Sequence, residues 1–254
     1  MPGIRTTPVV PLLLIASIAA FEVQLLADTF FGTHLLEMLA LVPYLVFEKH
    51  YYWQFFTYMF MHADLFHILF NLLILWMIGS ELEGQWGSKF FAKYYFVCGL
   101  AAGVFYLIVQ AFLRGTSAGM IPMVGSSGGV YGLLVAYGII YSERQMLFMM
   151  IFPMKAKHFV LLLAAIEFIS TVFYSRSGVA NAAHLGGMLV GFCYLFLNAW
   201  LRIRAKRVKS GGKRTKIRKS HLRLVVNNEV FKEFDDEEEE DSNDPDDPNR
   251  TTFH

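Results

Sequence analysis

The sequence predicts an all-α membrane protein in which six helices cross the bilayer and a charged tail follows them. Hydrophobic residues make up 55% of the 254-residue chain, whereas charged residues make up 17%, and the mean hydropathy is +0.43. A soluble domain carries about 25% charged residues. Most of the charge also falls after residue 201, so the preceding part of the chain is almost wholly apolar.

Six apolar windows have about the 20 residues that a helix needs to cross a bilayer. They are 8–27, 66–83, 90–112, 126–142, 156–174 and 181–201. The fourth window is short and glycine-rich. The first window is similar to a signal peptide, but only Arg5 precedes it and no clear cleavage site follows it, so we expect a retained helix.

The segment 28–65, between the first two windows, is too rich in aromatic residues to be a simple loop. Its run YYWQFF at 51–56 favours a position in the membrane interface, where tryptophan and tyrosine side chains concentrate. We therefore expect an interfacial first loop.

The distribution of lysine and arginine predicts that both termini lie in the cytoplasm. In that orientation the cytoplasmic flanks hold the basic tail and Arg5, Lys89, Arg144, Lys155 and Lys157. The outer flanks hold Lys49, Arg114 and Arg176. We expect an integral, multi-pass protein of the inner (plasma) membrane.

The tail changes the sign of its charge along its length. Eleven Lys and Arg residues and no acid lie between Arg202 and Arg223, and an acidic stretch follows, with DDEEEED at 235–241. Because this composition cannot build a core, we divide the chain into a membrane core at 1–203 and a disordered cytoplasmic tail at 204–254. The basic half favours contact with anionic lipids, although it could equally serve only to fix the orientation. We expect no nucleic-acid partner.

Polar side chains gather at one predicted depth of the membrane. His67 and Asn71 lie in the first turns of the second helix, Ser127 begins the fourth helix, and His184 lies near the start of the sixth. Since these three helices all begin at the outer face, the four side chains lie within about 10 Å of it. Ionisable groups at such a depth are costly and usually functional.

These residues predict a serine hydrolase site. A serine hydroxyl needs an adjacent base, and His184 is the histidine of a later span at the depth of Ser127. The free N–H groups at a helix start suit an oxyanion. His67 and Asn71, four residues apart on one helix face, can each donate a hydrogen bond to it. Tyr131, one turn after Ser127, is placed to pack against the ring of His184.

We expect no acid at this depth to complete a triad. Glu22 lies toward the outer end of the first helix, but the spacing gives no reason to include it. The sequence therefore predicts a dyad of Ser127 and His184. Glycines spaced four apart favour the close helix approach that the dyad needs. These pairs are Gly99/Gly103, Gly128/Gly132 and Gly187/Gly191.

Several motifs, in this order along about residues 50–195, resemble those of the rhomboid intramembrane serine proteases. HADLFHILFN at 62–71 resembles HxxxxHxxxN of that family, GSSG at 125–128 resembles GxSG, and AHLGGMLVG at 183–191 resembles AHxxGxxxG. Each motif alone has modest specificity, whereas the ordered combination is highly specific.

The resemblance implies roles for the residues that match these motifs. Ser127, between Gly125 and Gly128, is the implied nucleophile, and His184 is the implied base. Tyr131 matches the tyrosine that stacks on the catalytic histidine.

The resemblance also implies supporting roles. His67 and Asn71 match the oxyanion site and His62 matches a structural histidine. Glu83, in GSELEGQWG at 79–87, matches a glutamate that braces the second helix. The family's Trp-Arg pair in the first loop reads Trp53-Gln54 here. Glutamine cannot form the bidentate fork of arginine, which calls the anchoring of the first loop into question.

Other interpretations of these motifs are weaker. GSSGG at 125–129 also fits the G-x-S-x-G elbow of hydrolases, but that motif needs a strand before the serine. His62 and His67 are five residues apart, which does not suit a helical zinc site. Cys98 and Cys193 are interpreted as small buried residues rather than as a disulfide or a metal pair. We expect no metal and no cofactor.

The sequence thus predicts an intramembrane serine endopeptidase. Its substrate would be the transmembrane helix of a single-span membrane protein, cut near the outer face, and the resemblance implies a small residue at the cleavage position. The alternative is a rhomboid-like pseudoprotease that binds membrane helices without cutting them. A transporter or channel would call for discontinuous spans in paired repeats, which the sequence does not suggest.

Overall fold

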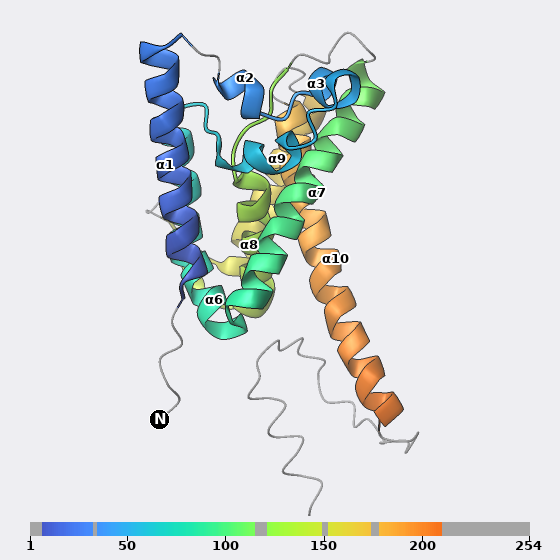
Figure 1. The fold of residues 1–254 in the computed structure, drawn as a ribbon. Helices are drawn as coiled ribbons and strands as arrows, with labels where there is room; N and C mark the ends of the chain where they lie inside the picture. Colours follow the sequence, from blue (N-terminus) through green and yellow to red (C-terminus); the bar gives the residue numbers. More distant parts are fainter. Residues whose placement is uncertain (1–6, 33–34, 115–120, 149–151, 174–177, 210–254) are drawn as a thin grey trace, which may run out of the picture. The chain divides into compact units, whose positions relative to one another are not determined.

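A computed structural model describes residues 7–32, 35–114, 121–148, 152–173 and 178–209 of the protein (Figure 1). The helices begin with α1 (Val9–Phe30), α2 (Leu35–Leu39), α3 (Pro43–Lys49), α4 (Gln54–Thr57) and the 3-10 turn η1 (Tyr58–Phe60). They continue with α5 (Leu65–Ile74), the π-helical turn η2 (Leu75–Gly79), α6 (Ser80–Trp86), α7 (Ser88–Arg114), α8 (Ser127–Ile140), α9 (Ala156–Phe173) and α10 (Gly178–Lys209). Two strands, β1 (Gln145–Phe148) and β2 (Phe152–Lys155), lie between α8 and α9.

In the described residues, five helical segments are long and apolar enough to cross a membrane. They are α1, α7, α9, α10 and the continuous rod formed by α5, η2 and α6. Helix α8 is also apolar but has only 14 residues. These six segments coincide with the six windows expected from the sequence, so the all-α membrane fold is confirmed. The number of bilayer crossings stays a prediction, because α8 is shorter than a full span of roughly 20 residues.

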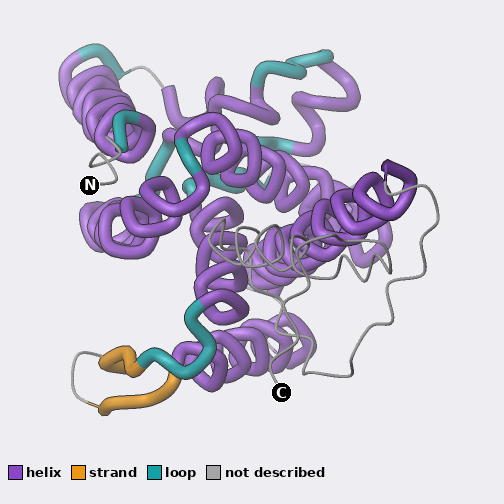
Figure 2. Tube along the Cα trace, turned by 90° about the horizontal axis from the view of Figure 1, so that it is seen from below, coloured by secondary structure: helices purple, strands orange, loops and turns teal. Residues whose placement is uncertain are grey.

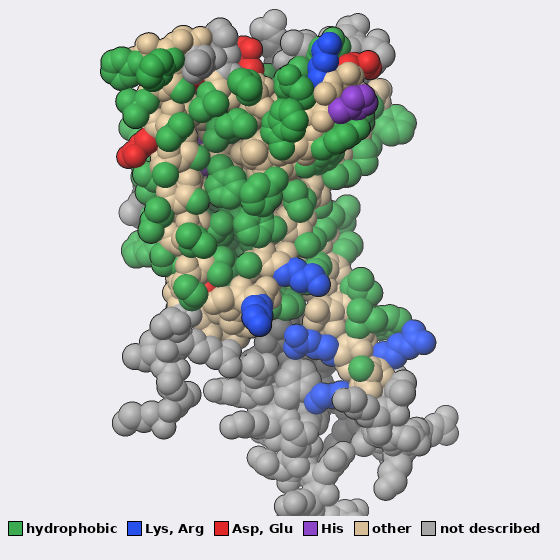
Figure 3. Space-filling model, viewed as in Figure 1, with side chains coloured by type: hydrophobic (Ala, Val, Ile, Leu, Met, Phe, Trp, Pro, Cys, Tyr) green, Lys and Arg blue, Asp and Glu red, His purple; other side chains and the backbone are tan. Residues whose placement is uncertain are grey.

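Helices α8 and α9 illustrate two ways in which a helix can be apolar on every side, by burial in a core or by contact with lipid. Eleven residues of α8 are buried, and the helix packs against α7, α9 and α10. By contrast, α9 buries only Ala156 and Glu167. On the face shown in Figure 3, apolar side chains cover the middle, whereas most Lys and Arg side chains lie in the lower part of the view, at the end of the bundle where α10 finishes. This pattern fits a bundle surrounded by lipid.

Glycines let α8 and α10 touch backbone to backbone. A Cβ atom on Gly187 would overlap the carbonyl group of Gly128, and one on Gly191 would lie 3.2 Å from the Cα of Gly132. Helix α7 packs across both helices through Cys98, whose Sγ would lie 2.5 Å from a Cβ on Gly132. Small residues at these positions therefore bring the starts of α8 and α10 together.

The first loop folds into the short helices α2, α3 and α4, and Gln54 anchors it. Gln54 Oε1 accepts a hydrogen bond from the N–H of Val42 (3.0 Å), and Nε2 donates to the carbonyl oxygens of Met38 (3.1 Å) and Glu37 (3.3 Å). Trp53 Nε1 also donates to the carbonyl of Met38 (3.2 Å). The amide of the fully buried Gln54 supplies both an acceptor and donors, which a guanidinium cannot do. The first loop therefore stays anchored although Gln54 takes the place of the arginine in the Trp-Arg pair.

One segment departs from the all-α expectation. Strands β1 and β2 form an antiparallel hairpin with Gln145 opposite Lys155, at the margin of the helices in Figure 2. Glu143, just before the hairpin, binds Lys155 Nζ at 2.7 Å and also binds Lys157 Nζ. These hydrogen bonds to two ammonium groups lower the pKa of Glu143 to about 2.

The end of the membrane core and one cysteine also differ from expectation. Helix α10 runs to Lys209, so the predicted tail begins as a helix beyond residue 203. The rest of the tail, 210–254, lies outside the described residues. Cys98 is buried as expected, but Cys193 is exposed on α10, so the prediction of a buried side chain is wrong there.

Candidate active site

Ser127 is the first residue of α8, on a backbone that is held from two sides. The segment before it is joined to the first loop by two hydrogen bonds of 2.9 Å between Met123 and Leu41. The N–H of Gly125 donates to the carbonyl oxygen of Tyr58 (2.9 Å). Gly125 has a φ of +107°, a conformation that favours glycine. Ser127 is thereby fixed where the first N–H groups of α8 have no partner within the helix.

Ser127 and His184 are in hydrogen-bonding contact, with Ser127 Oγ and His184 Nε2 2.7 Å apart. Ser127 is 7% exposed, and the side chain of His184 is 19% exposed. The ring of Tyr131 stacks on the ring of His184, with centroids 4.4 Å apart and planes inclined by 12°. Tyr131 therefore holds the face of the imidazole while its Nε2 points toward the serine hydroxyl.

A carboxylate lies on the other side of the same histidine, contrary to the sequence prediction. Glu167 Oε1 is 3.2 Å from His184 Nδ1, and the hydroxyl of Tyr131 donates to the same oxygen. The Nδ1 contact has the distance of an ion pair but not the angle of a hydrogen bond, and Nδ1 has no hydrogen-bond partner in the described part of the chain. The expectation that no acid reaches the depth of the dyad is therefore wrong.

One feature of the sequence and one of the observed helix bounds mark Glu167. It is the one acid in the predicted window 156–174. It also lies six residues before the end of α9, and His184 lies six residues after the start of α10, so each is about 9 Å from its helix end. The predicted window for the last helix began at 181, three residues after the observed start. That error placed His184 nearly a turn closer to the helix end, so Glu167 and His184 did not appear to lie at the same depth.

His67 reaches toward the serine from α5. Its N–H donates to Oδ1 of Asp64, the N-cap of α5 (2.8 Å), and its Nδ1 accepts from the N–H of Ala63 (3.4 Å). A neutral ring that accepts at Nδ1 carries its proton at Nε2. A Cβ atom on Gly125 would lie 2.7 Å from His67 Nε2 and 3.8 Å from Ser127 Oγ, so both atoms border the same small space.

Asn71 lies one turn further along α5 and is 6% exposed. Its Nδ2 donates to the carbonyl oxygen of His67 (2.8 Å). An amide nitrogen carries two hydrogens, so a second N–H is left for a ligand. Helix α5 therefore presents two side-chain donors at the spacing that the sequence indicated.

His62 and Glu83 join α1 to the rest of the bundle. The N–H of His62 donates to Gln24 Oε1 (3.3 Å), and its carbonyl oxygen accepts from Gln24 Nε2 (2.9 Å). Glu83 accepts from the N–H groups of the first two residues of α1, both at 2.9 Å, and from the hydroxyl of Ser88 (2.6 Å). A carboxylate at a helix N-terminus is also favoured by the helix dipole. These contacts hold structure together and do not reach the reacting groups.

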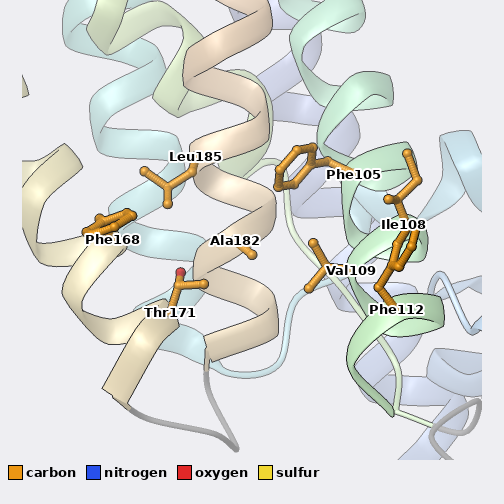
Figure 4. Close-up of a pocket in the computed structure, with 8 residues that line it drawn as sticks. All are labelled: Phe105, Ile108, Val109, Phe112, Phe168, Thr171, Ala182 and Leu185. Carbon is orange, nitrogen blue, oxygen red and sulfur yellow. The ribbon is translucent and has the colours of Figure 1, made fainter. Parts of the chain in front are cut away.

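A groove between helices contains none of the proposed reacting side chains in its lining. Eight residues of α7, α9 and α10 line it (Figure 4). Thr171 is the one polar side chain among them, and its hydroxyl donates to the carbonyl oxygen of Glu167 (2.7 Å). The lining offers neither a free nucleophile nor a base, so the groove suits a hydrocarbon chain rather than chemistry.

The arrangement around Ser127 has the parts that acyl transfer requires. A hydroxyl contacts a base, a helix start supplies N–H groups, and two side-chain donors border the same space. The parts come from α5, α8 and α10, with α9 adding the carboxylate that the sequence prediction missed.

Comparisons with known proteins match the membrane core. A family model described as "Rhomboid domain" matches residues 49–200. Rhomboid protein 1, mitochondrial, of Saccharomyces cerevisiae is 27% identical over 157 residues, which cover 61% of this chain and 44% of that protein. RHOMBOID-like protein 12, mitochondrial, of Arabidopsis thaliana is 27% identical over 160 residues, covering 59% of this chain and 46% of that protein.

A bacterial relative is similar over the same extent. Rhomboid protease GlpG of Salmonella choleraesuis is 31% identical over 160 residues, which cover 61% of this chain and 51% of that protein. The chain thus spans about half the length of the curated relatives it matches.

Proposed function

The chain belongs to the rhomboid family, and from this premise we propose that it is an intramembrane serine endopeptidase with Ser127 as nucleophile and His184 as base. It is an integral membrane protein, because the family domain coincides with apolar helices of spanning length. The observation that carries the proposal is the 2.7 Å contact between Ser127 Oγ and His184 Nε2 beneath the stacked ring of Tyr131.

The proposed reaction follows from these positions. His184 Nε2 takes the hydroxyl proton of Ser127 as Oγ bonds to the carbonyl carbon of the scissile peptide. The imidazolium then gives that proton to the leaving amine as the C–N bond breaks, leaving an ester on Ser127. Water hydrolyses the ester with His184 again acting as base, which restores the serine.

The oxyanion of each tetrahedral intermediate would be stabilised by three donors. They are the N–H of Ser127 at the start of α8, Nε2 of His67 and the second N–H of Asn71. Donors that are already in place stabilise the charge that develops in the transition state without having to reorganise.

We propose the transmembrane helix of a single-span membrane protein as the substrate, cut at a small residue near the outer face. Supporting this, Ser127 and His184 lie within the first two turns of their helices, and the Lys and Arg distribution favours cytoplasmic termini. The proposed location is the inner (plasma) membrane. The alternative is a pseudoprotease that binds transmembrane helices without cleaving them.

Reconstitution tests this proposal against its alternative. The purified chain and a Ser127→Ala variant are placed in liposomes with single-span substrates that carry small residues near one end of the span, and the fragments are identified by mass spectrometry. We expect cleavage by the unmodified chain and none by the variant. A folded chain that binds these substrates but leaves all of them intact would favour the pseudoprotease.

We further propose that the tail contacts anionic lipids and takes no part in catalysis. Supporting this, the basic run begins in the last turns of α10 and continues in the sequence after Lys209, and every proposed catalytic group lies within the helices. Deleting the residues after Lys209 should leave cleavage in detergent within about twofold and weaken the effect of anionic lipid in liposomes. A truncated chain that is folded yet inactive in detergent would make the tail part of the enzyme.

A further inference from the structure

We propose that Glu167 is a positioning residue for His184, so that Ser127, His184 and Glu167 act as a triad built from three helices. This inference rests on the proposed protease function and deepens it. The two ring nitrogens of His184 face opposite partners, because Nε2 lies 2.7 Å from Ser127 Oγ and Nδ1 lies 3.2 Å from Glu167 Oε1.

The carboxylate selects the tautomer that the base needs. A neutral imidazole carries its proton on one nitrogen and accepts at the other. A carboxylate beside Nδ1 favours the proton there, which leaves the lone pair of Nε2 free to take the proton of Ser127. Within the described residues, neither His184 Nδ1 nor Glu167 Oε2 has a hydrogen-bond partner, so no other acceptor competes for the proton on Nδ1.

Tyr131 holds the carboxylate and the imidazole together. Its hydroxyl donates to Glu167 Oε1, and its ring stacks on His184. The Nδ1 contact lies at 3.2 Å without the geometry of a hydrogen bond in this structure. Contacts of this kind are often loose in an unliganded enzyme and tighten when substrate binds.

The burial of Glu167 is difficult to explain by packing alone. Glu167 and Ala156 are the two buried residues of α9, and the side chain of Glu167 is 9% exposed. An acid within a membrane span is costly and is kept where it has a partner. Among the described residues no Lys or Arg forms an ion pair with Glu167, so a protonated His184 is the cation within its reach.

Glu167 would act during the proton transfer without changing its own protonation. When the proton of Ser127 moves to Nε2, His184 becomes an imidazolium whose Nδ1–H faces the carboxylate. The proton on Nδ1 stays on the ring, and the negative charge of Glu167 stabilises the imidazolium until Nε2 gives its proton to the leaving amine.

The alternative for Glu167 is a structural tie between α9 and α8, which the variants can distinguish. Glu167→Gln keeps the shape and an acceptor for Tyr131 but removes the charge. Glu167→Asp keeps the charge on a shorter side chain. Phe168→Leu is the matched control, because Phe168 is the next residue on α9 and is 61% exposed.

Three measurements follow for each variant: the thermal midpoint, kcat and KM for a transmembrane substrate, and the rate at which a fluorophosphonate labels Ser127. Removing the carboxylate from serine-protease triads costs about 10⁴-fold in kcat. Because Tyr131 still holds the ring, we expect a loss of about 10²-fold or more in kcat and in labelling for Glu167→Gln. We also expect KM within about twofold, partial recovery in Glu167→Asp, and no change in Phe168→Leu. A folded Glu167→Gln variant with unchanged kcat and labelling would overturn the proposal.

A measurement on the unmodified chain keeps the test independent of whether any variant folds. The ¹⁵N shifts of His184, assigned by comparison with His184→Asn, report which ring nitrogen carries the proton. We expect the proton on Nδ1 at neutral pH, and a proton on Nε2 would overturn the role of Glu167. If the unmodified chain neither cleaves nor labels, the proposed function fails, and the tautomer still decides for or against Glu167.

Discussion

A methyl group on Gly187 would overlap the carbonyl group of Gly128, because α8 and α10 touch at the turn that carries Ser127 and His184. The 2.7 Å contact between the two catalytic candidates thus depends on a backbone contact next to it. Gly187→Ala should therefore push the helices apart and lower kcat by at least tenfold. Overpacking of this kind typically also costs about 1–3 kcal/mol of stability.

Gly84→Ala is the matched control for this change. Its added Cβ would meet nothing closer than 3.8 Å, and alanine is favoured over glycine within a helix by up to about 1 kcal/mol. Thermal midpoints and substrate kinetics of both variants check the prediction. An active and stable Gly187→Ala variant would show that α8 and α10 can separate without loss.

The side-chain donors of α5 should act on one oxyanion. Loss of one such donor typically costs about 10²–10³ in kcat. Asn71→Ala should lose less than this, because His67 and the N–H of Ser127 remain. The double variant His67→Ala/Asn71→Ala should lose much more, and a kinetic cycle should reveal coupling between the two changes. Strictly additive effects would mean that the two side chains serve different purposes.

Gln54 should contribute more to stability than Trp53. Gln54→Leu leaves the buried N–H of Val42 without its hydrogen-bond partner and also removes the hydrogen bonds that Gln54 Nε2 donates. An unsatisfied buried group costs about 1–3 kcal/mol and a lost hydrogen bond about 1 kcal/mol, so we expect a loss of roughly 3 kcal/mol in the free energy of unfolding. Trp53→Phe removes one hydrogen bond from a side chain that is 47% exposed, and should lose about 1 kcal/mol. Denaturant titration in detergent compares the two, and equal losses would contradict the role given to Gln54.

His62 should make stability depend on pH. Its burial, and next the nearby His67, lower the pKa of His62 from 6.5 to about 4. In the unfolded chain the ring takes a proton near pH 6.5, whereas in the folded chain it resists one until about pH 4. Stability is therefore complete above pH 6.5 and falls as the pH drops toward 4, by about 3 kcal/mol.

The variant His62→Asn isolates this contribution. It should show a flatter dependence of the thermal midpoint on pH between 7 and 4, even if it is less stable throughout. The remaining slope belongs to the other titrating groups. If the slopes of the variant and the unmodified chain are the same, the titration of His62 does not set the pH dependence.

The sequence alone was enough to predict the site residues that lie near the starts of apolar helices. Ser127, His184, His67 and Asn71 each lie within the first two turns of an apolar helix, and helices that begin at one membrane face bring such residues to a similar depth. The depth of a residue in the membrane can be estimated from the hydropathy windows and the rise per residue of a helix. The contact between Ser127 and His184 could therefore be anticipated without a structure.

Glu167 escaped the prediction because it lies near the end of a helix rather than at a start. Comparing it with His184 required the true beginning of α10, and helix boundaries are the quantity that sequence patterns fix least well. The hydrogen bonds of Gln54 escaped for another reason. They go to backbone groups of the first loop, whose positions depend on how its short helices pack rather than on any local pattern.

Hydrogen bonds toward both ends of α1 constrain the number of residues between them. Glu83 holds its first two residues and Gln24 joins its far end to His62, so the tied partners lie just before and just after the stretch that contains His67 and Asn71. Substitutions on the lipid-facing side of α1 leave both sets of hydrogen bonds intact, so one apolar side chain can replace another there. Removing a single residue between Val10 and Gln24 rotates one tie by about 100° relative to the other, so that only one of them can form. The number of residues in α1 between its two tied positions is therefore more constrained than the identity of its lipid-facing side chains.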